Sequence, residues 1–251
     1  MKIASTVRTL LLAASLVFPT YGIAETAADY NTRGIAKVAK GDFDGAIADY
    51  TRALELDPKF AAAYRRRGIA KQAKSDFDGA IADFNRALEL DPKLAIAYAD
   101  RGISHFSSRH WSEALKDFNH FLDLSKDEQD YPRLFVWMIA ARLNGADAAN
   151  KDLTAYLDRR PNTEPSDWFP NVAGHLLGKV TEADLFAAAK SPDTKKELGQ
   201  LCEAWFYSGM KKLLGGDKTA AADHFQKCLA TEQKIFVEYQ FAQTELKSLA
   251  Q

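Results

Sequence analysis

Residues 30–59 read YNTRGIAKVAKGDFDGAIADYTRALELDPK, and residues 64–93 repeat them as YRRRGIAKQAKSDFDGAIADFNRALELDPK. The copies are 34 residues apart, and 25 of 32 positions are identical between residues 30–61 and 64–95. This period is typical of a unit of two antiparallel helices that cannot bury its apolar face alone and must stack on its neighbours. Such a stack presents a long concave surface to another chain. The period therefore predicts an all-α solenoid and favours binding over catalysis.

The shared text places small, aromatic and proline residues at fixed points of each copy. The first copy has Tyr30, Gly34, Ala46, Tyr50, Ala53 and Pro58, and the second has Tyr64, Gly68, Ala80, Phe84, Ala87 and Pro92. We expect glycine and alanine where two helices cross closely, because a larger side chain would force the helices apart. We expect proline at the end of each unit, because it cannot continue a helix from within. Asp42 and Asp76 precede the second helix of each copy and can cap its free N–H groups.

This pattern resembles the tetratricopeptide repeat (TPR) family. The resemblance implies a right-handed superhelix of helix-turn-helix units over residues 25–128, with copies at 27–60, 61–94 and 95–128. It also implies a concave groove lined by the first helix of each unit.

The period fades in the third copy and beyond it. Phe121 stands where the earlier copies have alanine, and Lys126 stands where they have proline. We expect a divergent helical pair over 129–160, a proline-punctuated helical insert over 161–201, and a TPR-like repeat with a capping helix over 202–251. The array should therefore end in divergent C-terminal helical pairs.

The resemblance assigns groove positions to residues of this chain. They are Asn31, Ile35 and Val38 in the first copy, Arg65, Ile69 and Gln72 in the second, and Ala99, Ile103 and Phe106 in the third. An isoleucine recurs at the middle position, which gives an apolar strip with polar flanks suited to a helix or an extended peptide. Arg65 and its neighbour Arg66 add positive charge that could hold a carboxylate. The alternative is that these charges are merely solvated.

Opposite charges recur in the same register. Arg33 is matched by Asp49, Arg67 by Asp83, and Arg101 by Asp117. In the last repeat the two positions are Ser208 and His224, so both charges disappear together. We predict an Arg–Asp contact between helices that is structural and not catalytic.

The chain has two cysteines, Cys202 and Cys228. We place them at the start of one helix and near the end of its antiparallel partner, so their side chains should meet. An exported chain meets oxidising conditions, and a disulfide closing this loop would contribute roughly 3–4 kcal/mol in the chain-entropy model. We predict that disulfide; two buried free thiols are the alternative.

Residues 1–24 have the features of a secretory signal peptide. Lys2 and Arg8 supply positive charge, residues 10–18 form a short apolar core, and residues 22–24 offer small side chains for cleavage before Glu25. The apolar run is shorter than the roughly 20 residues that span a bilayer. We expect a periplasmic or secreted protein that is not inserted in a membrane after cleavage. No cysteine lies directly after the apolar core to carry a lipid, since the first cysteine is Cys202. An uncleaved anchor is the alternative.

Composition and motifs argue against several functions. Cleavage of the signal peptide would remove Lys2 and Arg8 and leave 31 of the 33 basic residues against 34 acidic ones. Nucleic-acid binding requires a basic face, so this charge balance argues against it. None of the five histidines forms an HxxxH or HExxH motif. No P-loop, GxGxxG or GxSxG motif is present. We therefore expect no catalytic residues, no metal site, no cofactor and no nucleic-acid partner.

The order of parts resembles a narrower group, the NlpI-type periplasmic TPR proteins. The resemblance rests on the export signal followed by repeats, on Leu134-Phe135-Val136-Trp137, on Trp205-Phe206-Tyr207 with Gly209, and on Phe236-Val237-Glu238-Tyr239. It implies an adaptor, often homodimeric, that brings a periplasmic protease and peptidoglycan hydrolases together. A competing hypothesis is a structural assembly subunit of an envelope secretion or polysaccharide-export complex. A third hypothesis is that the protein is an enzyme.

Overall fold

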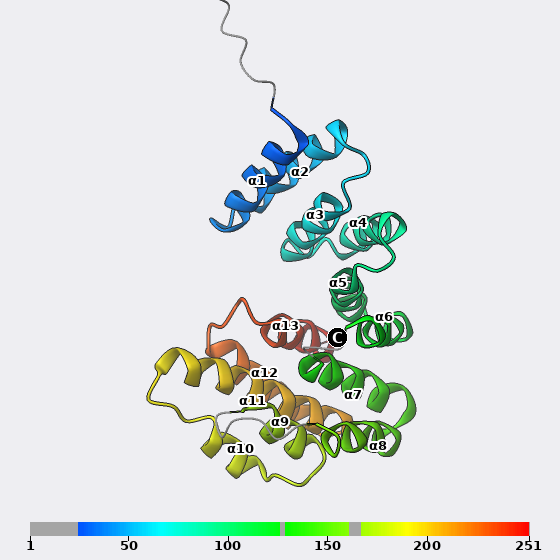
Figure 1. Cartoon of the computed structure of the whole chain (residues 1–251). Coiled ribbons are helices and arrows are strands. Elements are labelled where there is room, and N and C mark those ends of the chain that lie inside the picture. The colour runs from blue at the N-terminus through cyan, green and yellow to red at the C-terminus, as the bar shows by residue number, and fades with distance from the viewer. Residues whose placement is uncertain (1–24, 126–128, 161–166, 251) are drawn as a thin grey trace, which may run out of the picture.

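The computed structural model describes residues 25–125, 129–160 and 167–250. The predicted signal peptide, residues 1–24, and Lys126 lie outside these ranges. The described residues form thirteen α-helices and no strand. The first six helices make three antiparallel pairs: α1 (Ala27–Val38) with α2 (Phe43–Leu56), α3 (Ala61–Ala73) with α4 (Phe77–Leu90), and α5 (Ala95–Ser107) with α6 (Trp111–Leu124). Figure 1 shows these pairs stacked one on the next, as the 34-residue period predicts.

The remaining helices are α7 (Asp130–Asn144), α8 (Ala146–Leu157), α9 (Phe169–Leu176), α10 (Glu182–Ala188), α11 (Thr194–Leu214), α12 (Lys218–Ala230) and α13 (Val237–Leu249). The divergent pair expected over 129–160 is α7 and α8, and the insert contains α9 and α10. The predicted boundary at residue 202 is wrong, because α11 crosses it. Asp193 caps this helix by accepting from the backbone N–H groups of Lys195 and Lys196, and no proline interrupts it before it ends at Leu214.

Small residues set the distance between the two helices of each repeat. A methyl group on Gly34 would lie 2.5 Å from the Tyr50 ring, and one on Gly68 would lie 2.7 Å from the Phe84 ring. Only glycine therefore allows each aromatic ring to fill the crossing. Asp42 caps α2 as expected, by accepting from the backbone N–H of Gly45 at 2.9 Å.

The predicted Arg–Asp contacts are confirmed and lie within each repeat. The pairs are Arg33–Asp49, Arg67–Asp83 and Arg101–Asp117, each with an Nη2–Oδ1 distance of 2.6 Å. The arginine comes from the first helix and the buried aspartate from the second. Each pair therefore ties together the two helices of its repeat.

The last helix folds back onto the third repeat. Phe241 of α13 is fully buried, and its ring stacks on that of Phe106 with 3.9 Å between centroids. It also contacts the rings of Phe135 on α7 and Phe206 on α11. Figure 1 shows α13 between α5 and α12. One continuous core thus joins the third repeat to the C-terminal half. None of the described helices is both long enough and apolar enough to span a bilayer.

Candidate functional site

The predicted groove positions on α1 and α3 lie close together, but their polar groups bind each other. Arg66 donates from Nη1 to Oδ1 of the buried Asn31 at 2.9 Å. Arg65 donates from Nε to Oδ2 of Asp100 at 2.6 Å. Gln72 donates to the Ser104 hydroxyl at 3.1 Å. These residues connect successive first helices, and the carboxylate that Arg65 holds is that of Asp100 in the same chain.

Asp100 is the carboxylate that pairs with Arg65. Its burial raises its pKa to about 6, although the Arg65 guanidinium acts in the opposite direction. Near pH 7 the Arg65–Asp100 ion pair therefore has little net charge.

The isoleucine strip changes in accessibility along the array. Ile35 is 43% exposed. Ile69 is half-buried, and Val38 packs on the small cluster of Ala46, Tyr50 and Ala70. Ile103 is half-buried against the main core. The apolar surface is thus most accessible at the N-terminal end.

The assignment of Phe106 to an open groove is wrong. This side chain is fully buried beneath Phe241 of α13. The sequence predicts a capping helix at the end of the array, whereas α13 folds back over α5. Any partner that contacts Phe106 must first displace α13.

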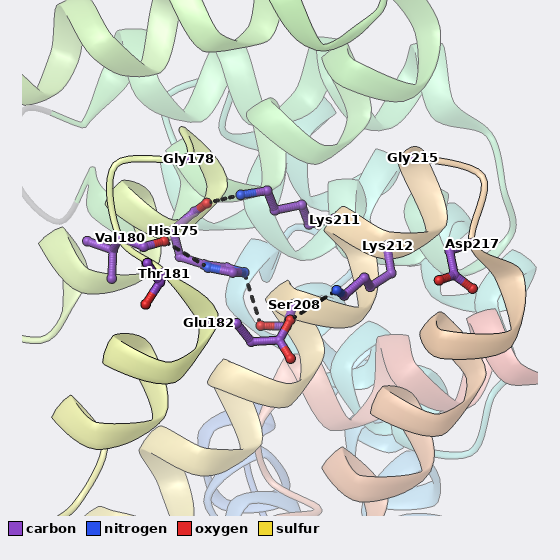
Figure 2. A pocket seen from close by; sticks show the side chains of 10 residues that line it. All are labelled: His175, Gly178, Val180, Thr181, Glu182, Ser208, Lys211, Lys212, Gly215 and Asp217. Atoms are coloured by element: carbon purple, nitrogen blue, oxygen red, sulfur yellow. Dashed lines mark hydrogen bonds and ion pairs between the residues drawn. The ribbon is translucent and has the colours of Figure 1, made fainter.

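The last repeat contains a pocket of about 480 Å³ where the insert meets α11. Figure 2 shows His175 pointing from the insert toward Ser208. Its Nδ1 lies 3.2 Å from the Val180 carbonyl oxygen and its Nε2 lies 3.1 Å from the Ser208 hydroxyl. Burial and the Lys211 ammonium lower the pKa of His175. A neutral ring that donates from Nδ1 and accepts at Nε2 satisfies both contacts, and Ser208 itself is fully buried.

Glu182 replaces the acid that the last repeat lacks. Lys212 stands in register with Lys37, whose ammonium pairs with Asp49 at 2.7 Å. In the last repeat that aspartate position holds His224, and Glu182 of α10 lies 3.4 Å from Lys212 and 3.2 Å from His224 Nε2. The Ser208 and His224 substitutions therefore mark the docking site of the insert.

The predicted disulfide partners lie side by side on α11 and α12. Cys202 and Cys228 are fully buried free thiols, and their Sγ atoms are 3.4 Å apart. A disulfide bond is about 2.05 Å long. The expected proximity is present, and the bond stays a prediction. Across the described ranges, no group of three or more His, Cys, Asp or Glu side chains could hold a metal ion.

Two buried carboxyl groups were not predicted from the sequence. Glu203 Oε2 accepts from the Tyr131 hydroxyl at 3.0 Å and from the Trp168 indole N–H at 2.9 Å. Glu238 accepts from the Tyr207 hydroxyl at 2.9 Å. Within the described part of the chain, neither carboxyl forms an ion pair with a basic side chain. Burial and the nearby Glu238 raise the pKa of Glu203 to about 9, and burial raises the pKa of Glu238.

Glu203 should make stability depend on pH. In the unfolded chain the carboxyl loses its proton near its ordinary pKa, about 4.3, whereas in the folded protein it keeps that proton to about pH 9. Between these values the folded state binds more protons, so wild-type stability should fall as pH rises. Glu203→Gln should show a shallower fall in melting temperature from pH 5 to pH 9. The exposed Glu232→Gln is the control, and equal slopes for all three proteins would contradict the assignment.

Comparison with known proteins supports the repeat fold. The tetratricopeptide repeat family matches residues 31–95 and also residues 67–134. A tetratricopeptide repeat protein from Parabacteroides merdae is 17% identical over 88% of this chain and 84% of its own, with a TM-score of 0.54. PilW, a type IV pilus biogenesis factor, is 17% identical over 90% of this chain and 98% of its own, with a TM-score of 0.53. The first TPR domain of Spaghetti, bound to an HSP90 peptide, is 26% identical over 47% of this chain and 93% of its own, with a TM-score of 0.46.

Proposed function

Because this chain is a tetratricopeptide repeat protein, we propose that it is a scaffold that holds a segment of another protein against α1 and α3. The observation that carries the proposal is the exposure of Ile35 in the C-terminal half of α1. Ile69 occupies the same register position on α3, and the Arg66–Asn31 hydrogen bond links the two helices beside the isoleucines. An apolar strip with a polar margin suits the apolar side of a helix or an extended peptide. Figure 1 shows α1 at the end of the stack remote from α13, and α3 in the middle pair.

Ile35→Asp should abolish partner binding without unfolding the repeats, because an aspartate would be desolvated at the contact but solvated in the free protein. Leu56→Asp is the matched control, since Leu56 is 46% exposed but lies on α2. Affinity purification from an envelope extract with wild type and both variants provides the measurement. Loss of the same captured proteins in both variants, or in neither, would contradict the proposed face.

The proposal also includes export of the protein and partners in the cell envelope. Residues 1–24 support secretion to the periplasm or beyond, and the NlpI-type resemblance supports envelope proteases or peptidoglycan hydrolases as partners and a homodimer as the assembly. The protein recovered from the periplasmic fraction should have the mass of a chain beginning at Glu25. Recovery of the uncut chain in the membrane fraction would argue for an anchor instead.

A further inference from the structure

A second cavity lies in the C-terminal half, remote in the fold from α1 and α3. Its volume is about 370 Å³. Glu203 of α11 lines it together with Tyr131 of α7, Trp168 before α9, and Phe236 at the start of α13. A buried carboxyl group and aromatic rings from four separate segments thus meet at one opening.

The carboxyl group is held in place but lacks a counter-charge. The Trp168 indole and the Tyr131 hydroxyl both donate to Oε2 of Glu203, whereas Oε1 has only a longer contact of 3.3 Å with Tyr131. Oε1 therefore keeps acceptor capacity. Burying an ionised carboxylate without a cation is costly, which is why Glu203 keeps its proton. A positive group entering the cavity would stabilise the ionised form.

The other charged groups of the cavity lie in the first turn of α11. They are Asp193, which caps the helix, and Lys195 and Lys196. Neither lysine lies within ion-pair distance of Glu203 in the described structure. The described residues thus place no cation at this carboxyl, and a bound partner could supply one that ionises Glu203.

We propose that this cavity receives an arginine side chain of a partner protein. A guanidinium can donate N–H groups to Oε1 while its plane stacks on an aromatic ring, and it is more weakly hydrated than an ammonium. It also stays charged when Glu203 ionises, because arginine does not deprotonate in proteins. This site lies outside the α1–α3 face and does not depend on it.

The surroundings of the cavity favour a protein over free arginine. Ile235 is 83% exposed and directly precedes Phe236 in the linker to α13. Tyr131 is also exposed on one side. A partner segment that inserts an arginine can cover these apolar groups, as anchored protein contacts do, whereas a free amino acid leaves Ile235 in water.

Titration of the purified full-length mature protein with acetyl-Leu-Arg-Leu-amide tests the proposal, with the Trp168 indole N–H resonance as the readout. A saturable shift is expected, with tighter binding at pH 8 than at pH 6, because binding favours the ionised form of Glu203. The same peptide with citrulline, a neutral analogue of arginine, should bind at least tenfold more weakly. Glu203→Gln, which keeps an acceptor for Trp168, should show the same loss while retaining the wild-type circular dichroism. Equal binding of the citrulline peptide, or undiminished binding by Glu203→Gln, would overturn the guanidinium site.

A titration with free L-arginine distinguishes a guanidinium supplied by a partner protein from one supplied by the free amino acid. It should bind at least tenfold more weakly than the peptide, and Ile235→Asp should remove that difference while leaving the binding of free arginine unchanged. If free arginine binds as tightly as the peptide, the partner-protein assignment is overturned. Ile235→Asp also serves as a second variant that does not touch the buried carboxyl groups.

Discussion

Phe241→Ala should lower the free energy of unfolding by about 3–5 kcal/mol, the range for removing a fully buried aromatic side chain. The reason is the position of the ring. It stacks on Phe106 and also contacts Phe135 and Phe206, so it joins α13 to α5, α7 and α11 at one point. Its loss leaves a cavity between the third repeat and the C-terminal half. Chemical denaturation followed by tryptophan fluorescence and by circular dichroism measures the change.

The destabilisation by Phe241→Ala should be confined to particular helices. Hydrogen exchange should accelerate in α13 and α5, because these helices lose their shared contact. Exchange in α1 and α2 should stay unchanged, since solenoid repeats contact mainly their neighbours. Gln243→Ala is the control, because Gln243 is exposed on the same helix. A wild-type denaturation midpoint for Phe241→Ala would show that α13 does not hold the two halves together.

Asp83→Ala should lower the free energy of unfolding by about 3 kcal/mol, because it removes one partner from a largely buried ion pair. Asp83 accepts from Nε and Nη2 of Arg67 at 2.9 and 2.6 Å, and the Lys71 ammonium lies 2.8 Å from Oδ2. The Arg67 side chain is only 17% exposed, so water cannot replace the lost carboxylate. Arg67 also donates to Thr51 of the preceding repeat at 3.1 Å, and this inter-repeat contact should loosen as well.

The first repeat offers the matched comparison. The Arg33–Asp49 pair has the same Nη2–Oδ1 distance, but Arg33 donates from both Nε and Nη2 to Oδ1, and its side chain is 44% exposed. Water solvates this arginine when its partner is removed. Asp49→Ala should therefore lower the free energy of unfolding clearly less than Asp83→Ala does. Urea denaturation of both variants in the same buffer measures the difference. A cost for Asp49→Ala equal to or above that for Asp83→Ala would contradict the role assigned to burial.

Much of the repeat array could be predicted because its contacts are local and periodic. Gly34 faces Tyr50, and Arg33 faces Asp49, at spacings that recur in every clear copy. Ile35 is exposed, as a groove position must be, and its role in binding stays a prediction. The assignment of Phe106 failed because its accessibility depends on Phe241, which lies far along the chain and outside the period.

The sequence by itself determined the helix pairs, the Arg–Asp contacts within them and the chain reversal between them, because each depends on residues within one repeat. Only the tertiary structure decided that α13 covers α5, that Glu182 supplies the acid missing from the last repeat, and that Glu203 meets Trp168 and Tyr131 at one cavity. These contacts join segments that share no period. Helical periodicity indicates which side of a helix is apolar, but not which distant segment packs against it, and that choice follows from how all the apolar surfaces are buried together.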